Sequence, residues 1–197
     1  MALGWSGHGT AYEGSRPDPI LAKAQQLTID VATVTGESRS APDDHAPPAR
    51  TIWYMIEATA NTSATPLRAW EVFSDVTAWP EMLPTVDAVE PIGGAEQRPA
   101  VDAAYVVRQP RLPKARWVIT DWRPGEAFTW VSVSPGIRTT GVHEVAETPG
   151  GSTTIRVGID WSGPMAWLAR LFYSRLARRY LVAEATTFAR VAEGGSR

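Results

Sequence analysis

The 197-residue sequence contains no cysteine and only three histidines. The lack of cysteine excludes disulfides, thiolate metal ligands and thiol nucleophiles. His8, His45 and His143 lie far apart, and no two have the spacing of metal ligands, so we expect neither a metal site nor a cofactor. The glycine motifs of serine hydrolases, phosphate-binding loops and dinucleotide-binding folds are also absent, which argues against a serine hydrolase or a nucleotide-dependent enzyme.

The chain also lacks an excess of basic residues and a long apolar run. Its formal net charge is −2 and its isoelectric point is near 5.9, which argues against a nucleic-acid partner, because such proteins neutralise phosphates with lysine and arginine. No apolar run is as long as a membrane span, and the N-terminus lacks the basic-then-apolar pattern of a secretion signal. We therefore expect a soluble, cytoplasmic protein without an integral membrane segment. The sequence identifies no protein partner.

Residues 1–49 differ in composition from the rest of the chain. They are rich in glycine, proline, serine and charged residues and poor in aromatic residues. Since such a segment cannot build a core, we expect residues 1–49 to form a disordered extension and residues 50–195 to form one domain. Local patterns favour a helix at 21–27 and a strand at 29–35. A regulatory or docking arm and an overlong reading frame are the alternatives.

The last long segment, residues 162–195, has the pattern of a single helix. Ser162-Gly163-Pro164 is a helix-start signal and Gly194-Gly195 is a typical helix end. Between them, residues spaced three and four apart form one mostly apolar face: Ala169, Tyr173, Leu176, Ala177, Tyr180, Glu184, Thr187, Phe188 and Val191. Because packing stabilises most protein helices, this face needs a broad partner.

The middle of the chain predicts seven strands. An alternating strand at 51–60 precedes two short helices, which Thr65-Pro66 and Asp75 can begin and which end before Pro84. Six further strands follow, separated by turn residues: 86–92, 101–109, 116–122, 128–133, 137–145 and 153–161. Their short connections favour an antiparallel meander.

One face of such a sheet is buried, and parity along each strand predicts the inward side chains. For 153–161 these are Thr153, Ile155, Val157, Ile159 and Trp161, since Thr154, Arg156 and Asp160 are polar. For 137–145 both parities are possible, and we favour Ile137, Thr139, Gly141, His143 and Val145. The economical packing is an α+β fold in which a curved seven-stranded antiparallel sheet wraps around the C-terminal helix and the short helices close one end.

Several motifs in this order resemble one known superfamily. They are Thr65-Pro66, AWEVFSDV at 69–76, WPE at 79–81, PTV at 84–86, WRPG at 122–125, FTW at 128–130, Pro135-Gly136, His143 and GSTT at 151–154. Together with the terminal helix, they resemble the SRPBCC (START-like, helix-grip) superfamily, in its polyketide cyclase/dehydrase-like branch, over residues 51–193. The resemblance implies a deep cavity between the sheet and the last helix, open near the short helices and strand loops, for a hydrophobic or aromatic small molecule.

Aromatic residues are the candidates for binding such a molecule. The nine tryptophans supply aromatic surface, which small-molecule pockets favour, and tyrosines can orient a ligand carbonyl or hydroxyl group. The expected ligand-binding residues are Trp70, Trp79, Tyr105, Trp117, Trp130, Tyr173 and Tyr180. The alternative is that the tryptophans fill the core and the tyrosines only border the cavity.

Two polar residues are the candidates for acid/base catalysis. A carboxylate at Glu184 would have a raised pKa in an apolar cavity, and an inward-facing His143 could transfer a proton. The alternatives are that Glu184 reaches solvent or pairs with an arginine such as Arg108 or Arg156, and that His143 is a hydrogen-bonded core histidine.

The outer face of the final helix combines arginines with apolar residues. Its members are Arg170, Arg175, Arg178 and Arg179, with Trp167, Leu168 and Phe172. This combination fits a surface for anionic lipid, and a solvated face with arginine stems over apolar surface is the alternative.

These features leave three classes of function. The first is the binding or carriage of a lipid-like or polyketide-like small molecule in an internal cavity. The second is a cofactor-independent cyclase or dehydratase that uses general acid/base residues in that cavity. The third is a protein-interaction module with an incidental cavity, because this fold hosts several unrelated functions.

Overall fold

The computed structural model describes residues 55–94 and 97–194. The predictions for residues 1–49, and the first residues of the strand predicted at 51–60, lie outside this part of the chain. The elements in order are β1 (Ile56–Thr62), α2 (Pro66–Ser74), the 3₁₀ turn η1 (Val76–Ala78), α3 (Trp79–Met82), β2 (Ala88–Pro91), β3 (Ala104–Arg108), β4 (Ala115–Arg123), β5 (Ala127–Ser134), β6 (Ile137–Glu147), β7 (Thr153–Ser162) and α4 (Ala166–Ala192).

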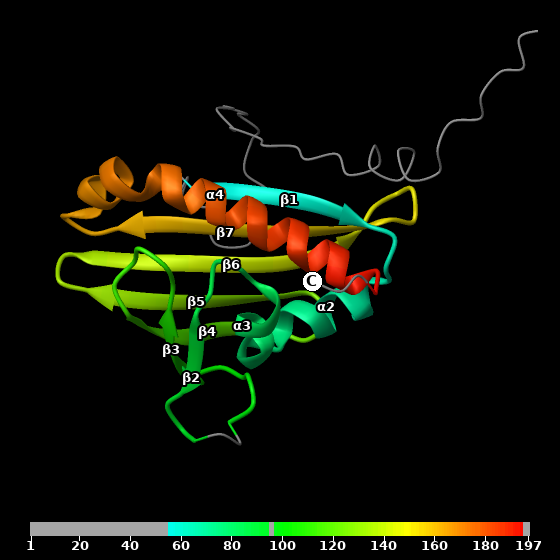
Figure 1. Cartoon of the computed structure of the whole chain (residues 1–197), viewed down its shortest axis with the longest axis horizontal. Helices are drawn as coiled ribbons and strands as arrows, with labels where there is room; N and C mark the ends of the chain where they lie inside the picture. Colours follow the sequence, from blue (N-terminus) through cyan, green and yellow to red (C-terminus); the bar gives the residue numbers. More distant parts are fainter. Residues whose placement is uncertain (1–54, 95–96, 195–197) are drawn as a thin grey trace, which may run out of the picture.

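The strands form one seven-stranded antiparallel sheet in the order β1-β7-β6-β5-β4-β3-β2. Strands β2 to β7 form the predicted meander, and β1 pairs with β7. A register shift between Ile119 and Asp121 in β4 marks a bulge, which bends a sheet. Helix α4 lies along one face of the sheet, and α2 lies near the C-terminal end of α4 (Figure 1). The predicted helix-grip architecture is confirmed.

The first helix begins as the sequence predicts. The Thr65 hydroxyl oxygen accepts a hydrogen bond from the Arg68 N–H at 3.2 Å, and Pro66 occupies the first turn, where it removes no needed donor. Asp75, in contrast, does not cap the next element with its side chain. Its carboxylate accepts a hydrogen bond from the Thr77 hydroxyl at 2.7 Å, so the prediction that Asp75 caps a helix is wrong.

Helix α4 begins later than predicted. Ser162, Gly163 and Pro164 precede the helix, which starts at Ala166 after Met165. Gly163 has a φ of +103°, and a Cβ at this position would lie 2.6 Å from the Gly136 carbonyl oxygen. The Ser-Gly-Pro segment is therefore a tight turn that packs on the β5–β6 hairpin, not a cap. At the other end, Gly194 has the expected left-handed conformation, with a φ of +85°.

Strand parity agrees with the prediction for β6 and β7. In β7 the buried residues include Ile155, Val157 and Trp161, and in β6 they include His143 and Val145. Asp160 differs from the expectation for an outward residue. It is only 2% exposed, and its carboxylate accepts a hydrogen bond from Arg170 at 3.3 Å.

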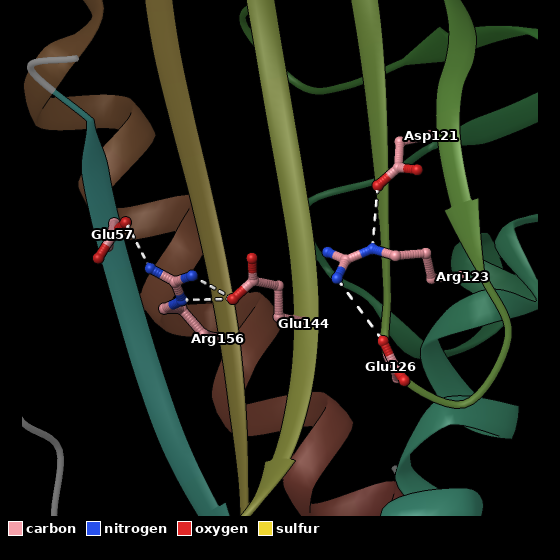
Figure 2. A network of polar contacts seen from close by, with 6 residues as sticks. All are labelled: Glu57, Asp121, Arg123, Glu126, Glu144 and Arg156. Atoms are coloured by element: carbon pink, nitrogen blue, oxygen red, sulfur yellow. Dashed lines mark hydrogen bonds and ion pairs between the residues drawn. The ribbon is translucent and has the colours of Figure 1, made fainter. Parts of the chain in front are cut away.

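Ion pairs connect neighbouring strands on the face of the sheet that α4 does not cover. Arg156 in β7 donates hydrogen bonds to Glu57 in β1 at 3.1 Å and to Glu144 in β6 at 2.9 Å (Figure 2). The side chain of Arg156 is only 33% exposed, so this bridge across three strands is less screened than an ordinary surface pair. Arg123 makes a second network with Asp121 and Glu126. Because Arg156 is occupied here, the alternative that it pairs with Glu184 is wrong.

Candidate functional site

A cavity of about 380 Å³ lies between the sheet and α4. Its buried end includes Trp79, Trp130, His143 and Glu184. Its exposed lining belongs to the β3–β4 loop, the start of β4 and the β5–β6 hairpin: Pro113, Lys114, Arg116, Val133 and Ser134. The mouth therefore lies among the strand loops, as expected. The expectation that the short helices also border the mouth is wrong, since they contribute only the buried Trp79.

Small residues leave the space that forms the cavity. In the first half of α4, Ala169 and Ala177 line the cavity with small side chains, and Gly141 lines it from β6. A Cβ at Gly141 would lie 2.7 Å from Cδ1 of Trp130, which no real Cβ contact allows. Gly141 thus lets the Trp130 indole lie against β6, where it stacks on Trp117 with ring centroids 4.8 Å apart.

The structure brings most of the predicted site residues together. Trp79, Trp117, Trp130, Tyr173 and Tyr180 line the cavity, together with both acid/base candidates, His143 and Glu184. The sequence did not single out Thr85, whose hydroxyl contacts Glu184, nor the polar lining residues Gln109, Ser132 and Lys114. Strand parity did place several lining residues beyond the predicted set inward: Ile137, Thr139, Gly141, Ile159 and Trp161.

Two predicted ligand-binding residues do not line the cavity. Trp70 packs edge-on against Phe73 and Trp122, with ring centroids 5.3 and 4.9 Å away. Tyr105 is fully buried in the core, and this burial raises the pKa of its hydroxyl group. The structure places both in the hydrophobic core. The core-filling alternative therefore describes Trp70, whereas Tyr105 neither binds in the cavity nor borders it.

His143 is enclosed by aromatic rings. Its imidazole stacks on Phe128 at 4.5 Å, and the rings of Trp79 and Trp130 lie 5.1 and 5.7 Å away. Burial lowers its pKa from 6.5 to about 3, so the ring is neutral at physiological pH. Neither ring nitrogen has a hydrogen-bond partner among the described residues. The alternative of a hydrogen-bonded core histidine is therefore wrong, and the ring has one donor and one acceptor unused.

Glu184 is a buried carboxyl group on α4. The Thr85 hydroxyl donates a hydrogen bond to its Oε1 at 3.3 Å. Burial raises the pKa of Glu184 to about 7, and the Thr85 hydrogen bond lowers it by a smaller amount. Within residues 55–94 and 97–194 it makes no ion pair, and Arg108 is exposed to solvent. Glu184 can therefore both donate and accept a proton near neutral pH.

Tyr180 has a role that the sequence did not predict. Its ring lines the cavity, but its hydroxyl donates a hydrogen bond to the Pro110 carbonyl oxygen at 2.5 Å. This bond joins α4 to the β3–β4 loop at the cavity wall. The hydroxyl is thus engaged in holding the loop, and Tyr173 is the lining tyrosine whose hydroxyl has no such bond to the described part of the chain.

The described residues contain no group of three or more histidine, aspartate or glutamate side chains placed to hold a metal ion. None of their helices combines the length and the apolar character that crossing a bilayer requires.

The fold and the cavity define a helix-grip protein with an internal pocket. Within this class, the family model described as polyketide cyclase/dehydrase and lipid transport matches residues 55–193. The chain belongs to this family. The match covers all the described strands and helices from β1 to α4 and confirms the resemblance seen in the sequence.

Solved structures share the fold at low sequence identity. The Zhui aromatase/cyclase from Streptomyces sp. R1128 has a TM-score of 0.58 and 16% identity, covering 71% of this chain and 93% of that chain. A norcoclaurine synthase from Thalictrum flavum has a TM-score of 0.54 and 15% identity, covering 70% and 92%. The di-domain aromatase/cyclase StfQ of the steffimycin biosynthetic pathway has a TM-score of 0.53 and 16% identity, covering 72% and 50%. No curated protein sequence matches this chain.

Proposed function

We propose that this protein binds or carries a hydrophobic or aromatic small molecule, lipid-like or polyketide-like, in the cavity between α4 and the sheet. The observation that supports this proposal best is the cavity itself: about 380 Å³, with tryptophan walls and two buried polar side chains at its inner end. Small-molecule pockets typically measure about 300 to 1,000 Å³ and combine apolar walls with a few polar groups.

The polar groups narrow the chemistry of the ligand. A buried polar group without a hydrogen-bond partner costs about 1–3 kcal/mol, and both nitrogens of His143 are in this position. A ligand with a carbonyl or hydroxyl group at its inner end would supply the missing partner. The stacked pair Trp117 and Trp130 favours a planar ring system in the rest of the cavity.

A second candidate function is a cofactor-independent cyclase or dehydratase. Glu184, with a pKa of about 7, and the neutral imidazole of His143 line the same cavity. Such a pair could move protons on an enolisable carbonyl compound. Two of the structurally similar proteins are described as aromatase/cyclases, which is chemistry of this kind. An interaction module with an incidental cavity has no specific observation in its favour, because side chains do not fill the cavity.

Binding is tested with the full chain as it is purified. Native mass spectrometry should detect a retained apolar metabolite, and 1-anilinonaphthalene-8-sulfonate should bind to protein stripped of it. Ala177→Phe places a large side chain in the cavity and should weaken dye binding at least tenfold, whereas Leu67→Ser on the exposed face of α2 should leave it unchanged. Equal dye affinity in wild type and Ala177→Phe would refute the cavity as the binding site.

Two conservative variants separate binding from catalysis. Glu184→Gln keeps the size of the side chain, His143→Asn keeps one hydrogen-bond donor group and one acceptor, and both remove the acid/base chemistry. A binding protein should keep most of its affinity for the retained metabolite in both variants. An enzyme should lose turnover of that metabolite, or of its precursor, by about 10²–10⁴-fold, the usual contribution of a general acid or base.

A further inference from the structure

Large apolar side chains gather on one exposed corner of the molecule. Trp167, Leu171 and Phe172 in the first turns of α4 are 61%, 67% and 68% exposed. Met165, just before the helix, is also exposed, at 43%. The Met165 N–H donates a hydrogen bond to the Gly136 carbonyl oxygen at 2.9 Å, which holds the helix start on the β5–β6 hairpin. We call Met165, Trp167, Leu171 and Phe172 the apolar corner; exposed apolar residues usually occur singly, not in such a group.

A basic block follows the apolar corner along the same helix. Arg175, Arg178 and Arg179 are exposed, and none forms an ion pair within the described part of the chain. No acidic residue occurs between Asp160 and Glu184. At 3.6 residues per turn, Trp167, Leu171, Arg175 and Arg178 project from the same side of α4. The rise along the helix from Leu171 to Arg178 is roughly 10 Å.

The apolar corner adjoins the mouth of the cavity. Val133 and Ser134 belong both to the exposed hairpin and to the cavity lining, and the cationic residues Lys114 and Arg116 lie on the same lining. In Figure 1 the first turns of α4 and the hairpin that joins β5 and β6 lie at the same end of the sheet. A flat surface that covers the apolar corner would therefore also lie close to the mouth.

We propose that this corner docks on an anionic lipid bilayer. The apolar corner enters the boundary between headgroups and acyl chains, and Arg175, Arg178 and Arg179 contact lipid phosphates about one to two turns beyond Leu171 along α4. The apolar corner and the basic block are separated along the helix axis. The acyl-chain boundary and the phosphate layer of a bilayer are likewise separated in depth. An acidic protein partner is the less suitable occupant, because the apolar side chains protrude from a convex helix and do not line a groove. The proposal does not depend on the identity of the cavity ligand.

Vesicle flotation with the full chain tests the docking surface. Wild-type protein should float with vesicles of phosphatidylcholine mixed with phosphatidylglycerol, should bind less as salt increases, and should not float with phosphatidylcholine alone. Trp167→Ser and Phe172→Ser should each weaken partitioning about tenfold, because each removes an apolar side chain from the bilayer boundary. Arg178→Gln should weaken it about fivefold. Leu67→Ser, which changes an equally exposed residue on α2, is the matched control.

Each outcome decides for or against the docking surface. Salt-sensitive flotation that Trp167→Ser weakens and Leu67→Ser does not would support it, with circular dichroism confirming that the variants are folded. A wild-type protein that does not float with the anionic vesicles would overturn it. Size-exclusion chromatography provides the other refutation: a wild-type dimer that Trp167→Ser converts to a monomer, with unchanged flotation, would assign the corner to a second copy of the chain.

Discussion

Replacing Glu184 with glutamine should stabilise the protein at neutral and alkaline pH and change little in acid. The carboxyl group has a raised pKa in the folded state because its ionised form is buried. Below the unfolded-state pKa, Glu184 is protonated in both states and contributes no pH dependence. As the pH rises, the unfolded chain releases this proton first, so the folded state loses stability until its own carboxyl group ionises near pH 7. Glutamine cannot ionise and avoids this loss.

The size of the effect follows from the two pKa values. The ordinary value is 4.5 and the folded value is about 7, and each pKa unit corresponds to about 1.4 kcal/mol. The difference of about 2.5 units gives a gain of roughly 3 kcal/mol for Glu184→Gln above pH 7. The gain should shrink with falling pH and vanish below about pH 4.5. For a protein of ordinary stability this is a large change.

His143 contributes to the pH dependence of stability in the opposite direction from Glu184. Its pKa falls from 6.5 to about 3 on folding, so below pH 6.5 the unfolded chain binds a proton that the buried ring does not bind. This contribution raises stability as pH rises, whereas that of Glu184 lowers it. Between about pH 4.5 and 6.5 the two slopes are opposite and similar in size. In Glu184→Gln only the His143 contribution remains of these two, so the unfolding free energy of the variant should rise with pH in this window. The variant should therefore become increasingly more stable than wild type.

Urea unfolding followed by tryptophan fluorescence at a series of pH values measures these free energies. Glu147→Gln removes an exposed carboxyl group from the end of β6 and serves as the matched control. The quantity to compare is the difference in unfolding free energy between each variant and wild type. A difference for Glu184→Gln that stays constant from pH 4 to pH 8 would refute the conclusion that this carboxyl group is buried and neutral in the fold.

Two further substitutions test the construction of the cavity. Gly141→Ala should cost about 1–3 kcal/mol in unfolding free energy and weaken dye binding, since the added methyl group meets the Trp130 indole. Gly150→Ala is the control, because Gly150 has open space around it. Equal stability of the two variants would contradict the predicted clash. Tyr180→Phe should cost about 0.5–1.5 kcal/mol in unfolding free energy, because the hydrogen bond to the Pro110 carbonyl oxygen is lost. The same loss should speed amide exchange at residues 111–116. Tyr173→Phe is its control, and unchanged exchange in Tyr180→Phe would show that the bond does not hold the loop.

The sequence predicts the sheet well because a strand leaves a direct pattern in the chain. Alternation fixed the inward residues of β7, and the same parity placed Gly141 and His143 inward in β6. The start of α4 could not be predicted in the same way. Ser162-Gly163-Pro164 suits a helix cap and a tight turn equally, and the choice depends on the approach of Gly163 to the distant Gly136.

The candidate site could be predicted in composition but not in arrangement. Trp70 and Trp79 lie nine residues apart on neighbouring short helices, yet the first packs in the core and the second closes the inner end of the cavity. Tyr180 was correctly expected on the cavity wall, but its hydroxyl binds a carbonyl oxygen 70 residues away in the sequence. Such contacts depend on how a loop folds over a helix, which neither periodicity nor composition records.

The inner face of α4 explains why the molecule is solid at one end and hollow at the other. Towards the C-terminus, Phe188 packs between Phe73 and Trp79, with ring centroids 6.0 and 5.5 Å away, and fills the space under α2. Towards the N-terminus, the inner residues include the small Ala169 and Ala177, and the rings of Tyr173 and Tyr180 line the cavity without filling it. His143 and Glu184 lie where the packed core meets the hollow. Aromatic rings enclose His143 and the Thr85 hydroxyl contacts Glu184, so under the proposed function the polar group of an amphipathic ligand would lie at this inner end.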